Sequence, residues 1–222
     1  MDEQIAAGRR LAELARSYID RHDKLGLARR LEADWSSDCL ALLLGDDDAG
    51  VVELAAIGLG LMGDMSCCPR LAHSLHHEGQ AVVLAAEDAL WSIWFRAGGC
   101  MGQAALTKIA EAIKAGTTEN VVPMLTELIR MLPTYAEAYH QRSQAYYLEG
   151  AYALVLRDAR RAFELNPWHF GALANQAHGL AALGRMQEAL RVYRQVLELH
   201  PRMPGVRESI RRLRERLALV EA

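Results

Sequence analysis

The stretch AEAYHQRSQAYYLEGAYALVLRDARRAFELNP, residues 136–167, decides the fold of this chain. Its central glycine and its final proline each belong to an evenly spaced series, and both series have the same step: Gly116, Gly150 and Gly184, and Pro133, Pro167 and Pro201. Such a step is typical of a helix–turn–helix repeat of about 34 residues. Glycine permits the left-handed turn after a helix and proline stops a helix, so each unit is predicted to be a helix, a glycine turn, a second helix and a proline stop. The expected fold class is all-α, a right-handed α-solenoid of helix hairpins.

A second repeat, with a slightly shorter constant step, runs through the N-terminal half. It aligns five pairs of apolar residues: Leu40 with Leu71, Leu44 with Leu75, Val51 with Val82, Ala55 with Ala86, and Leu59 with Leu90. Asp47 or Asp48 is expected to cap the helix that follows. Small residues in that helix, such as Gly58 and Gly60, are expected to let neighbouring helices approach closely. Helix hairpins are therefore predicted in this half as well.

Both halves resemble known repeat families. The repeats that end at Pro167 and Pro201 resemble the tetratricopeptide repeat (TPR) through Ala136-Glu137-Ala138-Tyr139, Ala145-Tyr146-Tyr147, Gly150, Ala162-Phe163 and Leu165-Asn166-Pro167, and then through Leu173, Ala177, Leu180, Gly184, Ala189-Leu190, Tyr193 and Leu199-His200-Pro201. The stretch from Leu44 to Asp64 resembles the HEAT-like repeat of the phycobilisome-lyase type. The combination is similar to bacterial repeat proteins that join the two types. This resemblance implies a fold and no activity.

We predict three parts: HEAT-like helical repeats in residues 1–98, TPR repeats in 99–203, and a C-terminal capping helix in 204–222. The first TPR repeat, Gly102 to Pro133, departs from the family pattern and has Pro123 inside its second helix. No segment reads as a strand. Helices are expected at about 3–19, 25–33, 36–44, 49–62, 68–76, 80–96, 102–115, 118–132, 135–149, 152–165, 169–183, 186–199 and 204–220.

Charge and composition limit the classes of protein to consider. The net charge of −3 divides into −7 for residues 1–98 and +4 for residues 99–222. No apolar stretch approaches the roughly 20 residues of a membrane span, and the first residues lack the pattern of a secretory signal. A cytoplasmic protein without a membrane segment is expected. Its four cysteines are predicted to be reduced and packed as small apolar side chains.

Each sequence pattern that could indicate a cofactor or metal site occurs without the further residues that such a site needs. Gly58-Leu59-Gly60-Leu61-Met62-Gly63 matches a dinucleotide fingerprint, but no alternating βα pattern follows it. His76-His77-Glu78 resembles one His-Glu pair of HEAT-like di-iron hydroxylases, which need several such pairs. Asp46-Asp47-Asp48 lacks calcium-loop spacing. We therefore expect no enzyme activity, no metal and no cofactor. A HEAT-like metalloenzyme or lyase accessory is the alternative.

The C-terminal helix is rich in arginine, with Arg202, Arg207, Arg211, Arg212, Arg214 and Arg216. Nucleic-acid binding through this helix is a second alternative. It is disfavoured because Glu208 lies at helical spacing from Arg211 and Arg212, where opposite charges pair. Self-association through an uncapped N-terminal helix face also remains open.

The TPR resemblance implies where a partner would bind. In that family the first helix of each repeat lines a concave groove, which here presents Glu137, His140, Gln141, Gln144 and Tyr147, followed by Gly171, Ala174, Asn175, His178 and Ala181. Residues three, four and seven apart form one stripe on a helix. Members that bind chaperone tails hold a carboxylate with lysines, an arginine and asparagines, and only Asn175 matches that set. The expected function is a non-enzymatic scaffold or adaptor that binds a peptide or partner segment in this groove.

Overall fold

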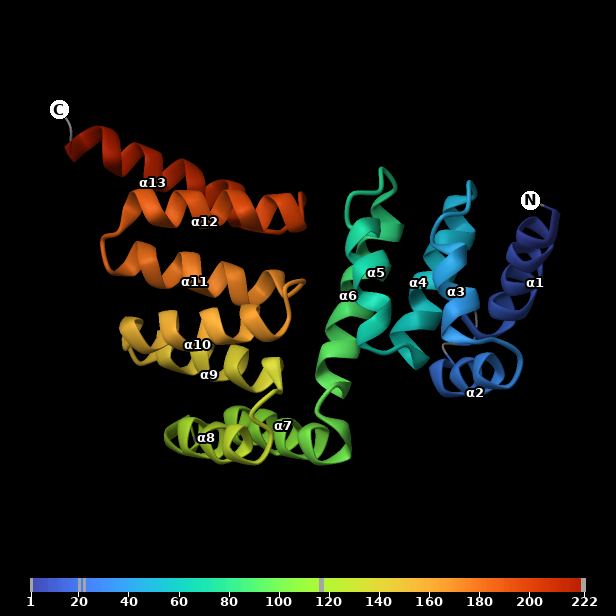
Figure 1. Ribbon diagram of the computed structural model, residues 1–222, viewed down its shortest axis with the longest axis horizontal. Helices are drawn as coiled ribbons and strands as arrows, with labels where there is room; N and C mark the ends of the chain where they lie inside the picture. Colours follow the sequence, from blue (N-terminus) through green and yellow to red (C-terminus); the bar gives the residue numbers. More distant parts are fainter. Residues whose placement is uncertain (1, 20, 22, 116–117, 221–222) are drawn as a thin grey trace. The chain divides into compact units, whose positions relative to one another are not determined.

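The structure is a computed structural model that describes residues 2–19, 21, 23–115 and 118–220. Helices dominate this part of the chain, and no strand occurs within it. The fold class is the expected one, an all-α arrangement of successive helix hairpins (Figure 1). Two compact units are present, residues 1–97 and residues 98–222.

The N-terminal unit contains six α-helices and a short 3-10 helix among its described residues. Their bounds are α1 Asp2–Ile19, α2 Lys24–Asp34, α3 Ser37–Leu43, α4 Ala49–Met62, η1 Met65–Cys67, α5 Cys68–Ser74 and α6 Gln80–Arg96. The expected cap of α4 is confirmed: Asp48 precedes the helix, and its carboxylate accepts a hydrogen bond from the Gly50 amide at 2.8 Å. Capping of this kind satisfies an amide that has no partner inside the helix.

α4 and α6 form the centre of the N-terminal unit. A Cβ atom placed on Gly60 would lie only 3.0 Å from the Cα atom of Ala89, so the two helices approach closely where α4 lacks a side chain. The close approach expected from the small residues is confirmed at this position. Cys67 and Cys68 are buried as expected, whereas Cys39 and Cys100 are exposed, which corrects the prediction for those two thiols.

Arg96 connects the end of α6 to the end of α4. Its guanidinium donates to the carbonyl oxygens of Gly60 at 2.6 Å and Gly63 at 2.8 Å. Carbonyls at a helix C-terminus lack partners inside the helix and carry the negative end of the helix dipole. The arginine therefore satisfies two such groups with one cation.

The C-terminal unit contains seven α-helices and a 3-10 helix among its described residues. Their bounds are α7 Gly99–Lys114, η2 Thr118–Asn120, α8 Val121–Met131, α9 Ala136–Leu148, α10 Tyr152–Leu165, α11 Phe170–Ala182, α12 Met186–Leu199 and α13 Val206–Val220. The predicted turn glycines Gly150 and Gly184 adopt φ of +73° and +76°. Both values lie in the left-handed region that favours glycine. Gly116, the third member of that series, lies outside the described residues.

The proline stops are also confirmed. α8, α10 and α12 each end two residues before a proline, and the residue between adopts a similar non-helical conformation each time: Leu132, Asn166 and His200, with φ of −128°, −139° and −135°. Proline disfavours helical backbone in the residue before it. One local rule thus ends the second helix of three successive hairpins.

Three predicted helix starts are corrected. α8 begins at Val121, so Pro123 lies in its first turn, where an amide would have no partner inside the helix. α13 begins at Val206, because Gly205 has a φ of +77°. α7 begins at Gly99, slightly earlier than expected. These changes move helix ends without changing the number of hairpins.

The expected capping helix covers an apolar surface. Val206, Ile210 and Leu213 of α13 are buried in a cluster with Tyr193 and Val196 of α12. They lie at the i, i+4, i+7 spacing of a single helix face. α13 thus takes the place that the first helix of a further repeat would occupy.

A buried ion pair joins α9 to α10. Arg142 donates to both carboxylate oxygens of Asp158, at 2.6 and 3.1 Å, and also to the Thr126 hydroxyl of α8 at 3.0 Å. The side chains of the pair are only 9% and 1% exposed. Asp158 also accepts from Arg157. The pair therefore connects three consecutive helices inside the unit.

None of the described helices has an apolar stretch long enough to cross a membrane.

Arg96→Ala should weaken the N-terminal unit, because two carbonyl oxygens would lose a charged donor. We expect a loss of about 2 kcal/mol in the opening free energy of α4, since hydrogen bonds to charged groups contribute about 1.5–3 kcal/mol. Hydrogen exchange read by mass spectrometry would show faster exchange in α4 and α6 and no change in α9 to α12. Arg70→Ala is the matched control, because Arg70 donates one bond, to the Ala41 carbonyl. Equal effects of both substitutions would contradict the role of Arg96.

The Arg142–Asp158 pair generates a second prediction. Asp158→Leu alone leaves the buried charge of Arg142 without its carboxylate and should destabilise the C-terminal unit by about 3–5 kcal/mol. Arg142→Met alone should cost less, because Asp158 keeps its bond to Arg157. The double variant should recover much of that loss, because no isolated charge remains. Urea unfolding followed by circular dichroism, with hydrogen exchange to assign the unit, would measure the three variants. A double variant as unstable as the sum of both single ones would refute the coupling.

Candidate partner-binding face

α9 and α11 are the first helices of successive repeats in the C-terminal unit, whose order Figure 1 shows. The two helices contact each other. The common repeat step gives Gln141 and Asn175 equivalent positions, and likewise Gln144 and His178. We use the term α9–α11 face for the five side chains with polar groups on these helices that were predicted to meet a partner and that reach solvent: Gln141, Gln144, Tyr147, Asn175 and His178.

Exposure differs along the predicted stripe. Gln144 and Tyr147 are exposed, and Gln141, Asn175 and His178 are half-buried. Glu137 and His140, by contrast, are only 3% and 1% exposed. The expectation that these two side chains are displayed to a partner is therefore wrong. Of the other positions in the predicted stripe, Gly171 and Ala174 are buried and Ala181 is half-buried.

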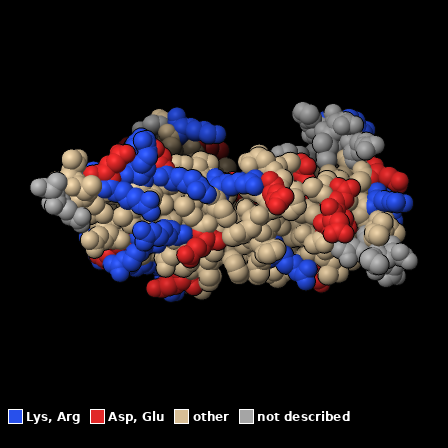
Figure 2. Space-filling view, turned by 90° about the horizontal axis from the view of Figure 1, so that it is seen from above, with Lys and Arg blue, Asp and Glu red and all other residues tan. Residues whose placement is uncertain are grey.

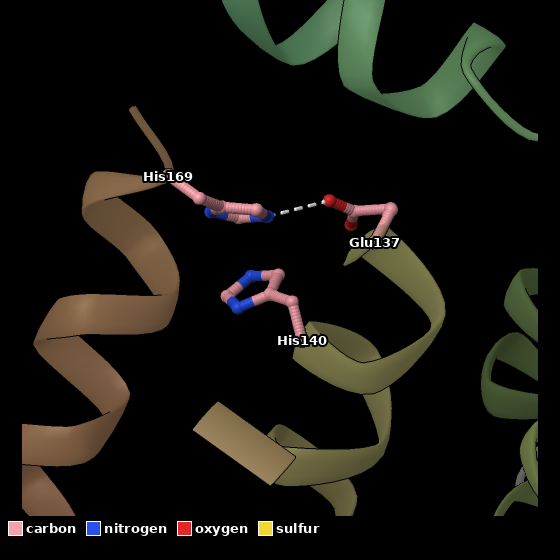
Figure 3. A group of neighbouring side chains, drawn as sticks. All are labelled: Glu137, His140 and His169. Carbon is pink, nitrogen blue, oxygen red and sulfur yellow. Dashed lines mark hydrogen bonds and ion pairs between the residues drawn. The ribbon is translucent and has the colours of Figure 1, made fainter. Parts of the chain in front are cut away.

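Glu137 and His140 instead meet His169 at the start of α11 (Figure 3). His169 caps that helix: its Nδ1 accepts a hydrogen bond from the Ala172 amide at 3.2 Å. Because Nδ1 is an acceptor, the proton of this neutral imidazole is on Nε2. His169 Nε2 lies 3.0 Å from a carboxylate oxygen of Glu137, to which it donates. The cap of one helix thus sets the direction of a hydrogen bond to the neighbouring repeat.

The other oxygen of Glu137 faces the α9–α11 face. Gln141 Nε2 donates to it at 2.6 Å. The buried carboxylate therefore accepts one bond from inside the unit and one from a partly exposed side chain. Burial without such bonds would be costly for a carboxylate.

A second branch runs through Ser143. Its hydroxyl donates to the His140 carbonyl at 2.7 Å, so the oxygen lone pairs remain to accept. Asn175 Nδ2 donates to that oxygen at 2.8 Å and lies 3.4 Å from His140 Nδ1. These contacts fix which end of the Asn175 amide points inward, since only its nitrogen can donate.

Burial governs the protonation of the network. It lowers the pKa of His140 to about 3, with the neighbouring His169 acting in the same direction, and lowers the pKa of His169 to about 3. Burial also raises the pKa of Glu137, which His140 and the Gln141 hydrogen bond oppose. Both imidazoles are neutral at pH 7, so the contact between His169 and Glu137 is a hydrogen bond to a neutral ring.

The three side chains are of types that bind metals, and one donor atom from each lies within 4.8 Å of the others. A zinc ion needs imidazole nitrogens at about 2.0–2.1 Å. A metal on His169 Nε2 would displace its proton to Nδ1, where the Ala172 amide already points. The residues fit a closed hydrogen-bond network better than a metal centre.

The sequence analysis missed His169 and Ser143. Both are polar, and both lie in repeat positions where the family pattern gave no role. The signal that was available is a histidine at the first position of the helix predicted over 169–183, where a side chain that accepts from the first turn is favoured. Its partner Glu137, in the preceding repeat, follows only from packing.

Aromatic rings adjoin the network at the C-terminal end of α9. The Tyr147 ring centroid lies 5.5 Å from that of Tyr152 and 6.0 Å from that of His178. His178 in turn meets Tyr193 edge to face at 5.5 Å. Burial lowers the pKa of His178, so this ring is neutral too. The α9–α11 face thus combines amide groups with an exposed tyrosine ring.

The two alternative sites suggested by the sequence, the His-Glu pair and the arginine-rich helix α13, both form internal hydrogen bonds. His77 Nδ1 accepts from the Gly79 amide at 2.9 Å, so His77 closes the turn before α6. In α13, Glu208 accepts from Arg211 and Arg212, as the sequence indicated. Figure 2 shows the lysine and arginine side chains over the C-terminal helices interspersed with acidic ones. This internal pairing weakens the argument for nucleic-acid binding through α13.

Known proteins offer partial matches. No protein-family model matches the chain. A TPR repeat-containing protein of Rhizobium etli is 29% identical over 108 residues, which are 49% of this chain and 53% of that protein. Human serine/threonine-protein phosphatase 5 is 33% identical over 95 residues, 43% of this chain and 19% of the phosphatase. The chain thus spans about half the length of the first relative and a fifth of the second.

Among solved structures, the first TPR domain of human RPAP3 is similar in fold. Its TM-score is 0.51 at 24% identity, and the match covers 54% of this chain and 94% of that domain. HEAT-like repeats are not shown by these comparisons, so they stay a prediction for residues 1–98. The chain is thus similar to TPR repeat proteins over about half of its length, and the solved domain supports the fold of that half.

Proposed function

We propose that the chain is a non-enzymatic, cytoplasmic adaptor whose C-terminal unit binds a segment of a partner protein on the α9–α11 face. The observation that carries this proposal is the pairing of partly exposed polar side chains from two successive repeats over a buried network. Gln144 and Tyr147 reach solvent. Gln141 and Asn175 donate hydrogen bonds to the buried side chains of Glu137 and Ser143, which hold the two amides in place. Amides and a tyrosine hydroxyl can pair with the polar groups of a peptide backbone.

Rigidity supports the same proposal. The network and the Arg142–Asp158 pair restrain α9 against α11 and α10. A face that is already ordered loses little conformational entropy when a partner binds. Similarity to TPR repeat proteins adds to this argument, because repeats of this kind present extended binding surfaces.

Glu137 and His140 have a different role in this proposal from the one expected. Both are buried, so they support the face rather than touch the partner. Contact is proposed for the five residues of the α9–α11 face. Substitution of His140 would therefore test the stability of the unit, and substitutions of exposed residues test binding.

Photo-crosslinking tests the location of the interface. A p-benzoylphenylalanine at position 147 should crosslink a partner in lysate of the source cells, because this side chain is 40% exposed on the proposed face. The same group at position 160, an exposed site on α10, is the matched control. Gln144→Ala combined with Tyr147→Ala should weaken capture of that partner roughly tenfold, as expected for an interface hot spot. Crosslinks from position 160 alone, or from neither position, would contradict the proposal.

A further inference from the structure

The two amide side chains of the α9–α11 face are oriented, and their orientation selects the chemistry of a partner. Gln141 uses an N–H group on Glu137, and Asn175 directs its nitrogen to Ser143 and His140. The carbonyl oxygens of both amides must then point the other way. No donor to either oxygen occurs in the described part of the chain, and neither oxygen is buried. The face therefore offers two oriented acceptors to solvent.

This orientation is fixed from inside the unit. Backbone geometry places the Ala172 amide on His169 Nδ1, which puts the ring proton on Nε2 toward Glu137. The second oxygen of Glu137 accepts from Gln141 Nε2 at 2.6 Å, and when Glu137 is ionised only the nitrogen end of that amide can satisfy it. Turning the amide over would place an oxygen against an oxygen. Repulsion between the acceptors keeps the Gln141 carbonyl outward.

The distribution of charged residues on α9 and α11 favours the same kind of partner as the two carbonyl oxygens, a hydrogen-bond donor. α11 contains no charged residue, and the single cation of α9, Arg142, is buried and paired with Asp158. Glu137 lies directly beneath the face and has no cationic partner in the described contacts. The two helices thus place no exposed cation beside the two carbonyl oxygens.

The tyrosine ring adds a third preference. Tyr147 is exposed and stands beside Tyr152 and His178. The face of a tyrosine ring attracts ammonium and guanidinium groups. Two oriented acceptors, the lack of an exposed cation on α9 and α11, and an aromatic ring together match one class of side chain.

We propose that the α9–α11 face binds a basic segment of a partner protein, with an arginine or lysine side chain that donates to the carbonyl oxygens of Gln141 and Asn175. This inference rests on the proposed function and specifies its partner. It also opposes the capture of an acidic C-terminal tail, because a carboxylate would meet two carbonyl oxygens and no cation.

Three labelled pools of short peptides of equal length test this chemistry by fluorescence anisotropy with the full chain. The pools are randomised over uncharged residues and carry Arg-Lys, Gln-Ser or Asp-Glu at the centre. We expect the basic pool to bind at least about tenfold more tightly than the other two, the ratio for one or two charged hydrogen bonds. Tyr147→Ala should weaken that binding.

Gln141→Lys is the decisive variant. Its ammonium can donate to Glu137, which neutralises the carboxylate and removes the outward carbonyl, so basic-pool binding should fall about tenfold or more. Gln187→Lys, at an exposed site on α12, adds the same charge elsewhere and should leave binding unchanged. This control matters because residues 1–98 are acidic and attract basic peptides generally. Gln141→Met removes the acceptor without adding charge and should also weaken binding; circular dichroism checks that each variant folds.

The outcomes separate the two proposals. Preferred binding of the uncharged or acidic pool, lost in Tyr147→Ala, would overturn the basic partner and leave the interface in place. An equal effect of Gln187→Lys and Gln141→Lys would overturn the oriented acceptors. Absence of binding by every pool overturns the basic partner, and only a lack of crosslinks from position 147 removes the interface as well.

Discussion

The turn between paired helices is the constraint on which the C-terminal unit depends. Gly150 and Gly184 both take left-handed backbone conformations, and the residue before each repeat proline is non-helical. These two local features fix the length of each hairpin, so equivalent residues recur at a constant step and lie on neighbouring helices. Without that register, Gln141 and Asn175 would not share a face, and His169 would not reach Glu137.

Within this register, polar groups are buried on two sides of α9. On one side Arg142 and Asp158 form a charged pair, and on the other Glu137 and His169 form a hydrogen bond with a neutral ring. Buried polar groups contribute little net stability and carry a large penalty when a partner is missing. Their joint effect is to restrict the ways in which α9 can pack. A purely apolar interface between repeats would tolerate small shifts along the helix axes, whereas these bonds tolerate very few.

Helices, turns and stops could be predicted because their causes are local. A glycine that needs positive φ, an aspartate that caps α4 and a residue held extended by a following proline act within a few residues of themselves. The stripe on α9 could be predicted in position but not in exposure. Whether His140 faces solvent depends on Asn175 and His169, which belong to the next repeat, and helical spacing contains no information about that contact. The Arg142–Asp158 pair was missed because it joins the two helices of one hairpin, and spacing along a single helix does not show which residues of another helix it contacts.

An amide on an ordinary protein surface can present either its oxygen or its nitrogen to a ligand, so it discriminates weakly between donors and acceptors. On the α9–α11 face this freedom is removed by a chain of bonds that begins at a backbone amide, which cannot reverse its polarity. The backbone amide of Ala172 determines the tautomer of His169, and that tautomer makes His169 Nε2 the donor to Glu137. The ionised carboxylate of Glu137 then determines that the nitrogen of the Gln141 amide points inward. The specificity of the face would then depend on a helix cap that no partner touches. It follows that a substitution at His169 would alter partner preference as well as stability, although the residue is completely buried.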